Sequence, residues 1–269
     1  WSRSRRSRRG QATSASTGVI MSVNNSLVCA PIYSHGSEEQ KQQYLPDLAT
    51  GAKLGCFSLS EPGSGSDAAG MKTVALKDGD HFVANGTKNW ITNGKEADVC
   101  ILLALSDPAQ KQRGISAFIV DTKSPGISVG KPEEKLGICA SSTTTHTYED
   151  VLIPAENLLG DENHGFKVAM KALDGGRIGI AAQALGIGRA AFEKAVRYST
   201  ERQAFGSPIA DFQALQFMVA DMATRLDAAR MLIWRAAWLK DQNLPVIKEA
   251  AMAKLFASET AMKICHILP

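Results

Sequence analysis

The chain has 269 residues, 44% hydrophobic and 21% charged, a balance typical of a globular protein with a buried core and not of a disordered chain. Glycine and proline, at 23 and 10 residues, are near ordinary usage, which excludes collagen-like and low-complexity chains. The formal charge is +3, but five of the 30 basic residues fall in the first ten positions, leaving 25 against 27 acidic residues. Since nucleic-acid-binding domains carry their positive charge on a folded face, we expect no nucleic-acid partner.

A basic tail, residues 1–13, opens the chain with the sequence WSRSRRSRRG. Such an Arg- and Ser-rich stretch without acidic residues is typical of a mitochondrial targeting segment. It fits a solvated tail equally well, and both interpretations stay open. No segment approaches the roughly 18 uncharged apolar residues of a membrane span, so we expect a soluble protein without one.

Residues 14–51 follow a helical pattern. Ser37 and Gln40 stand at the spacing of a capping box. Tyr44, Leu45 and Leu48 then repeat at helical intervals. The segment is too short to form a domain alone.

From residue 54 to about residue 154 the pattern changes to short β-rich runs separated by turns. The runs include LGCFSLS, VCILLAL, GISAFIV and GISVG. Asp78-Gly79 and Asn85-Gly86 are strong hairpin signals between alternating runs. Several short strands at close spacing predict an antiparallel sandwich or barrel.

Three long helical segments follow, near residues 165–200, 211–242 and 246–264. The middle segment carries an apolar stripe at spacings of three and four, made of Leu215, Met218, Met222, Leu226, Ala229, Ile233 and Ala236. Such a stripe predicts packing between helices. The expected fold class is therefore α+β, a central antiparallel β-barrel or sandwich followed by an antiparallel helical bundle, with a small helical piece in front.

Cysteine and histidine residues are scattered along the chain. The cysteines are Cys29, Cys56, Cys100, Cys139 and Cys265, and the histidines are His35, His81, His146, His164 and His266. This spacing contains no CxxC pair and no zinc pattern. We therefore expect buried or idle thiols in a reducing compartment, surface or capping histidines, and no metal site.

A Gly-rich loop, EPGSGSDAAG at residues 61–70, follows a predicted strand. It fails the dinucleotide-binding spacing because Ala68 stands where the third glycine is needed. A strand follows it instead of a helix, so on its own the loop is typical of a turn. The chain also has no GxxxxGK[ST], HExxH or GxSxG motif, which leaves P-loop, zincin and nucleophile-elbow chemistry without support.

Four motifs stand out together: CFSLSEPGSGSD at 56–67, TKNWITN at 87–93, KALDGGRIGIAAQALGIG at 171–188 and ERQAFGSPIADFQALQ at 201–216. In this order and at these separations they resemble the acyl-CoA dehydrogenase family. The segment ASTGVIMSVNNSL at 15–27 is most similar to the short-chain, butyryl-CoA type. The resemblance implies that 14–53 is a remnant of an N-terminal helical domain, 54–155 a middle β-domain that forms a flavin platform, and 156–269 an incomplete C-terminal helical bundle.

The same resemblance implies an FAD site and a substrate site. The implied cofactor-binding residues are Phe57, Leu59, Ser60, Gly65, Ser66, Trp90, Ile91, Thr92, Arg202, Phe205 and Gln213, and the implied substrate-binding residues are Ser66, Asp174 and Arg177. Ser60 and Thr92 would hydrogen-bond the flavin ring edge, and Trp90 would cover a flavin face.

In the family's oligomer, the positions of Arg202, Phe205 and Gln213 reach the FAD of a neighbouring subunit. Arginine suits a diphosphate because its planar fork binds anionic oxygens in pairs. Without the family, the 201–216 segment fits a turn between two helices. Asp174 and Arg177, three residues apart on one helix face, equally fit a surface ion pair.

The implied reaction is the α,β-dehydrogenation of a short-chain fatty acyl-CoA to the trans-2-enoyl-CoA in fatty acid β-oxidation. Electrons would pass to an electron-transfer flavoprotein. The implied assembly is a homotetramer, a dimer of dimers, in the mitochondrial matrix of a eukaryote or the cytoplasm of a bacterium. Three alternatives stay open: a catalytically inactive remnant, a partner subunit, or an acyl-CoA oxidase.

The sequence departs from the family pattern at the general base, so no catalytic residue is assigned. Most members carry this Glu in a segment that would lie beyond Pro269, and a minority carry it at the position of Gly176. We therefore expect a chain truncated at both ends that does not bleach its flavin with butyryl-CoA. Two further departures are Cys139, in place of a common Arg, and the polar run THTYED at 145–150, where His146 and Thr147 are expected to weaken strand packing.

Overall fold

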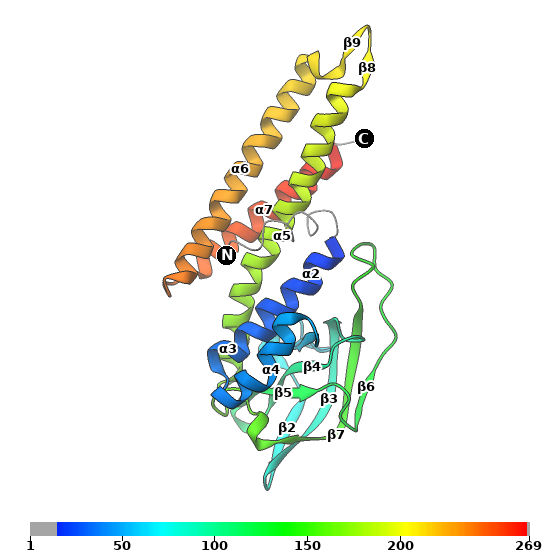
Figure 1. Ribbon diagram of the computed structural model, residues 1–269. Coiled ribbons are helices and arrows are strands. Elements are labelled where there is room, and N and C mark those ends of the chain that lie inside the picture. The colour runs from blue at the N-terminus through cyan, green and yellow to red at the C-terminus, as the bar shows by residue number, and fades with distance from the viewer. Residues whose placement is uncertain (1–14, 268–269) are drawn as a thin grey trace. The chain divides into compact units, whose positions relative to one another are not determined.

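The computed structural model describes residues 15–267, and Figure 1 shows their helices and strands in chain order. The basic tail expected at residues 1–13 and the last two residues lie outside the described part. The chain divides into two compact units. We call Ile20–Gly176 the β unit, and Arg177 onward, with the segment that ends at Val19, the helical unit.

The first described segment is helical, as its pattern predicts. It consists of α2 (Ala15–Val23), a π-helical turn (Asn24–Cys29), α3 (Ala30–His35) and α4 (Glu38–Thr50). The capping box is confirmed: Ser37 Oγ accepts from Gln40 N at 3.2 Å, and Gln40 Oε1 accepts from Ser37 N at 3.1 Å. Gln40 Nε2 also donates to the carbonyl oxygens of Glu156 and Leu158. Gln40 thus connects α4 to the segment that contains Glu156 and Leu158.

Seven strands form one curled sheet in the β unit (Figure 1). They are β1 (Gly55–Ser58), β2 (Val74–Asp78), β3 (His81–Thr92), β4 (Val99–Leu105), β5 (Ile115–Asp121), β6 (Ile127–Val129) and β7 (Thr143–Pro154). The order is β1-β4-β2-β3-β7-β6, and β5 pairs with β4. Antiparallel pairing dominates as predicted, while β4 runs parallel to β1 and, through one residue pair, to β2.

The two faces of the sheet pack against different apolar clusters. Phe57 and Leu59 on one face pack with helical residues such as Val28 and Ile32. Cys56, the neighbour of Phe57, belongs to the second cluster. Side chains alternate between faces along a strand, so β1 contributes to both cores at once.

Of the two predicted hairpin turns, one is confirmed and one is wrong. Asp78-Gly79 lies at the β2–β3 hairpin, and Gly79 has a φ of +61°. Asn85-Gly86 lies inside β3, where the pairing with β7 shifts by one residue between Ala84 and Gly86. Gly86 has a φ of +148° and serves a β-bulge, which needs a permissive backbone for the same reason as a turn.

Gly86→Ala is expected to lower the free energy of unfolding by about 2 to 4 kcal/mol, because it combines a disfavoured φ with a steric clash. A Cβ on Gly86 would lie 2.5 Å from Thr73 Oγ1 and 2.8 Å from Thr73 Cα. The matched control is Gly79→Ala, where no atom lies within 4 Å and only the φ penalty, about 1 to 2 kcal/mol, applies. Urea denaturation of both variants checks the difference; equal losses would contradict the packing argument.

The expectation that polar residues weaken the packing of β7 is wrong. His146 is fully buried and Tyr148 is 1% exposed, while Thr147 is half-buried. The expected surface or capping position of His146 is therefore also wrong. β7 pairs with β3 over most of its length. His146 Nε2 hydrogen-bonds the carbonyl oxygen of Gly94, and Tyr148 Oη donates to Ser58 Oγ, so these two polar side chains are accommodated in the buried strand.

Three long helices dominate the rest of the chain, as predicted. They are α5 (Gly165–Glu201), α6 (Gln213–Asp241) and α7 (Ile247–Ile267), and the short strands β8 (Gln203–Ala204) and β9 (Ser207–Pro208) connect the first two. Five members of the predicted stripe on α6 are buried, whereas Leu215 is half-buried and Met218 is 45% exposed. Across residues 15–267, no helix is both long and apolar enough to cross a membrane.

Candidate functional site

A buried ion pair holds the loop between β1 and β2. Lys88 Nζ on β3 lies 2.8 Å from Glu61 Oε1, with the Lys88 side chain fully buried and the Glu61 side chain 6% exposed. Lys88 Nζ also donates to the carbonyl oxygen of Leu59 at 3.0 Å. A single buried ammonium thus binds both the start of the loop and its first acidic residue.

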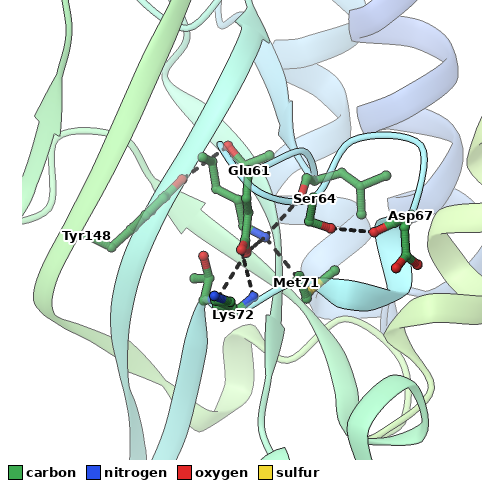
Figure 2. Close-up of polar contacts among 10 residues, drawn as sticks. Glu61, Ser64, Asp67, Met71, Lys72 and Tyr148 are labelled. Atoms are coloured by element: carbon green, nitrogen blue, oxygen red, sulfur yellow. Dashed lines mark hydrogen bonds and ion pairs between the residues drawn. The ribbon is translucent and has the colours of Figure 1, made fainter.

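The Glu61 carboxylate also closes the far end of this loop (Figure 2). It accepts hydrogen bonds from the backbone N–H groups of Lys72 at 2.6 Å and Thr73 at 3.0 Å. Burial opposes ionisation of Glu61, but the charge of Lys88 and these hydrogen bonds outweigh it, so the pKa of Glu61 lies below its ordinary value. Glu61 is therefore a carboxylate at neutral pH.

Inside the loop, further hydrogen bonds set a compact turn. Glu61 and Ser64 exchange two backbone hydrogen bonds, and Ser64 Oγ donates to the carbonyl oxygen of Asp67 (Figure 2). Gly65 and Ser66 lie at the exposed tip. The loop therefore presents Ser66 on a fixed turn next to the sheet.

Strand β3 brings Trp90 and Thr92 beside this loop. Asn89 N donates to the carbonyl oxygen of Ser60 at 2.8 Å, and the pairing of β3 with β7 shifts between Lys88 and Ile91. At this bulge Trp90 has a φ of +62° and is 63% exposed. A bulky residue in the left-handed region is strained, and such strain often occurs at functional sites.

The structure divides the other predicted β-unit residues into surface and core. Ser60 and Thr92 are half-buried at the loop and at the end of β3, which places two hydroxyl groups in the segments that flank the exposed indole. Phe57, Leu59 and Ile91 are 9%, 8% and 1% exposed, so their side chains support the platform from within. No role is predicted for Glu61 or Lys88 from the sequence, although both occur in the motifs at 56–67 and 87–93.

Arg202, Phe205 and Gln213 lie in the helical unit, on the connection from α5 to α6. Arg202 is exposed, and its carbonyl oxygen accepts from Ile209 N at 2.9 Å. Phe205 is 99% exposed with a φ of +50°, and Gln213 begins α6 with an exposed side chain. These three residues therefore form a surface group on one connection.

Asp174 and Arg177 both lie on α5, and both are half-buried. Gly176 lies between them on the same helix, and the nearest atom to a Cβ placed there is Leu27 Cδ2 at 3.2 Å. This contact is with the end of a flexible side chain. A larger residue at position 176 is thus compatible with the surroundings that the β unit provides.

Family models match nearly the whole chain: the acyl-CoA dehydrogenase N-terminal domain over residues 9–52, the middle domain over 56–151 and the C-terminal domain over 163–268. The chain is 55% identical over 252 residues to the mitochondrial short-chain specific acyl-CoA dehydrogenase of Rattus norvegicus, and this alignment covers 94% of the chain. It covers 61% of that relative, so the chain spans about three fifths of the length of the curated relatives it matches.

Solved structures show the same similarity. Butyryl-CoA dehydrogenase from Megasphaera elsdenii superposes with a TM-score of 0.93 at 44% identity, covering 96% of this chain and 67% of that chain. A glutaryl-CoA dehydrogenase from Mycobacterium smegmatis in complex with FADH2 superposes with a TM-score of 0.85 at 36% identity, covering 93% and 63% of the two chains. The α+β fold class expected from the sequence is confirmed, and the chain belongs to the acyl-CoA dehydrogenase family.

Proposed function

We propose that this chain binds FAD on the β unit and takes part in the dehydrogenation of a short-chain acyl-CoA. The observation that carries the proposal is the Glu61–Lys88 ion pair, which fixes the Gly-rich loop beside the exposed, strained Trp90. An aromatic face flanked by hydroxyl groups suits a flat, hydrogen-bonding ring. A structural neighbour is a dehydrogenase in complex with FADH2, which supports FAD as the ligand of this surface.

Each β-unit residue has a proposed task. Trp90 covers one face of the flavin ring, and Ser60 and Thr92 hydrogen-bond the ring edge. Gly65 and Ser66 approach the cofactor and the acyl chain from the fixed loop, while Phe57, Leu59 and Ile91 form the strand backbone beneath. When bound, FAD supplies the hydride acceptor of the reaction. The protein's part is to orient the ring and the thioester and to exclude water.

Residues of the helical unit, together with Asp174 of the β unit, have a complementary proposed task. Arg202 offers a guanidinium to the FAD diphosphate, and Phe205 and Gln213 contact its adenine end, across the interface of a homotetramer built as a dimer of dimers. Asp174 and Arg177 bind on the CoA side of the substrate. These tasks explain why an exposed Phe205 and an exposed Arg202 stand on one connection.

The proposed reaction removes one hydrogen from each of the α and β carbons of a short-chain acyl-CoA, forming the trans-2-enoyl-CoA within fatty acid β-oxidation. Support comes from the short-chain specific relative and the butyryl-CoA dehydrogenase neighbour. Electrons then pass to an electron-transfer flavoprotein. The proposed location is the mitochondrial matrix in a eukaryote, as the name of the rat relative suggests, or the cytoplasm in a bacterium.

Arg202→Ala is expected to weaken FAD binding roughly 30- to several-thousand-fold, equivalent to about 2 to 5 kcal/mol. The physical reason is that charge-assisted hydrogen bonds to a diphosphate at an interface are short and strong. Titration of the apoprotein with FAD, followed by flavin fluorescence, measures the change.

The matched control is Arg189→Ala, because Arg189 is 55% exposed on α5 and forms only a surface ion pair with Glu193 at 2.7 Å. Such pairs contribute little, so FAD affinity is expected to stay unchanged. Equal affinity in the two variants would show that Arg202 is a turn residue. Absence of FAD binding by the unsubstituted protein would refute the proposed function itself.

A further inference from the structure

Three side chains able to bind a metal ion meet inside the β unit. They are Cys56 on β1, Cys100 on β4 and His146 on β7. Their ligand atoms all lie within 4.8 Å of one another, and all three residues are fully buried. Cys56 and Cys100 are direct partners on parallel strands, so both thiols enter the same interior space where His146 arrives from β7.

The imidazole of His146 is held in an orientation that suits a metal ligand. His146 Nε2 lies 2.9 Å from the carbonyl oxygen of Gly94, which can only accept, so Nε2 carries the proton. In the neutral ring Nδ1 then keeps its lone pair. A backbone carbonyl that fixes one ring nitrogen is the usual second partner of a histidine that binds a metal through the other.

Hydroxyl groups surround the Cys100 thiol. Cys100 Sγ lies 3.1 Å from Ser58 Oγ and 3.5 Å from Tyr148 Oη, and Tyr148 Oη also lies 3.5 Å from His146 Nδ1 and donates to Ser58 Oγ at 3.1 Å. Figure 2 shows the side chain of Tyr148, a residue of β7.

We propose that Cys56, Cys100 and His146 form a structural zinc site in which Sγ, Sγ and Nδ1 bind the ion and the Tyr148 hydroxyl group lies beside the fourth position. Neighbouring ligand atoms of a tetrahedral zinc site are about 3.5 to 3.8 Å apart. Because one ligand atom of each residue already lies within 4.8 Å of the other two, small side-chain rotations bring the ligands to this spacing.

The charge of the site balances in an apolar core. Each thiol releases one proton to solvent when the ion binds, so two thiolates neutralise one Zn²⁺, and no oxidation or reduction takes place. A buried neutral assembly avoids the cost of an unpaired buried charge. The ion would link β1, β4 and β7, and because its ligands are fully buried it would enter as the β unit folds.

The first test measures zinc in the 269-residue protein. After expression with zinc, reducing purification and dialysis against EDTA, elemental analysis is expected to find about one zinc per chain. Refolding with Co²⁺ instead should give the intense visible bands of tetrahedral cobalt and a thiolate-to-cobalt charge-transfer band. Stoichiometry near zero, or cobalt spectra of octahedral type, would overturn the proposal.

Variants then assign the ligands. Cys100→Ala and His146→Leu are expected to lose zinc and the cobalt bands, whereas Cys139→Ala and His81→Leu, at positions outside the cluster, are expected to keep both. Full zinc retention in Cys100→Ala or His146→Leu would refute the assignment.

A second measurement needs no variant and covers the case in which a ligand substitution prevents folding. The thermal midpoint of the unsubstituted protein should be higher after refolding with Zn²⁺ than after refolding with EDTA, since an ion bound only by the folded state stabilises it. An unchanged midpoint would contradict the site. A mass two hydrogens lower, with Cys56 and Cys100 joined, would show a disulfide and also overturn it.

Discussion

Replacing Lys88 with methionine is expected to lower the free energy of unfolding by about 3 to 5 kcal/mol, because removing one partner of a buried ion pair leaves the other charge uncompensated. Lys88 is fully buried, and Glu61 accepts from it at 2.8 Å. The two backbone N–H groups that also bind Glu61 cannot neutralise its charge. Urea denaturation at pH 7 measures the loss.

Two further variants distinguish the effect of the uncompensated buried charge from the effect of removing any lysine. Lys72→Met changes an exposed lysine side chain and is expected to stay within about 0.5 kcal/mol of the unsubstituted protein. The double variant Glu61→Gln/Lys88→Met removes the stranded charge and is expected to recover part of the loss. A single Lys88→Met variant no less stable than Lys72→Met would refute the role given to the pair.

The Glu61–Lys88 pair predicts that the free energy of unfolding depends on pH in opposite directions in the unsubstituted protein and in Lys88→Met. In the unsubstituted protein the pKa of Glu61 is lowered in the folded state. The ionised Glu61 therefore stabilises the fold at pH values above its pKa in the unfolded chain, about 4.3. This stabilisation is lost as the pH falls through the pKa of the folded state. In Lys88→Met, burial without Lys88 raises this pKa, so protonation favours the folded state. The stability difference should therefore narrow between pH 7 and pH 4; a constant gap would contradict this explanation.

Gly176→Glu is expected to accelerate flavin reduction by butyryl-CoA about 10²- to 10⁴-fold in the FAD-loaded 269-residue chain, the usual contribution of a general base. Family resemblance implies a catalytic Glu at this position in a minority of members. Only the tip of Leu27 lies near a Cβ at position 176, so the side chain can be accommodated. Anaerobic stopped-flow absorbance at the flavin band follows the reaction.

Gly176→Gln is the matched control, since glutamine has the same size and carries no basic carboxylate. It is expected to react at the rate of the unsubstituted chain. Equal rates for the Glu and Gln variants would show that position 176 does not reach the substrate α-proton. A fast reaction without any substitution would instead show that another residue of this chain already acts as the base.

Local signals in the sequence predict local structure well. Ser37 and Gln40 predict the start of a helix, because both residues of the capping box lie within one helical turn. The hairpin turn predicted at Asn85-Gly86 is wrong for a physical reason, because a β-bulge and a hairpin turn both require the conformational freedom of glycine. Only the pairing of β3 with β7, which joins distant parts of the chain, distinguishes the two.

Contacts between distant strands could not be predicted in this way. Cys56, Cys100 and His146 have no motif spacing, yet the order and register of the strands bring them together. His146 looked like a surface residue because its strand is polar in sequence. Lys88 was overlooked for a similar reason, since a lysine is rarely buried and its partner lies 27 positions earlier in the chain.

The bulge in β3 determines which side chains of this strand are buried and which are exposed. In a regular strand, residues two apart face the same side, yet Lys88 is fully buried and Trp90 is 63% exposed. The register shift before Ile91 is what separates them. Deleting or inserting a single residue between Lys88 and Ile91 would exchange the buried and the exposed side chains of the strand beyond it, so the length of this stretch determines whether Trp90 reaches the surface.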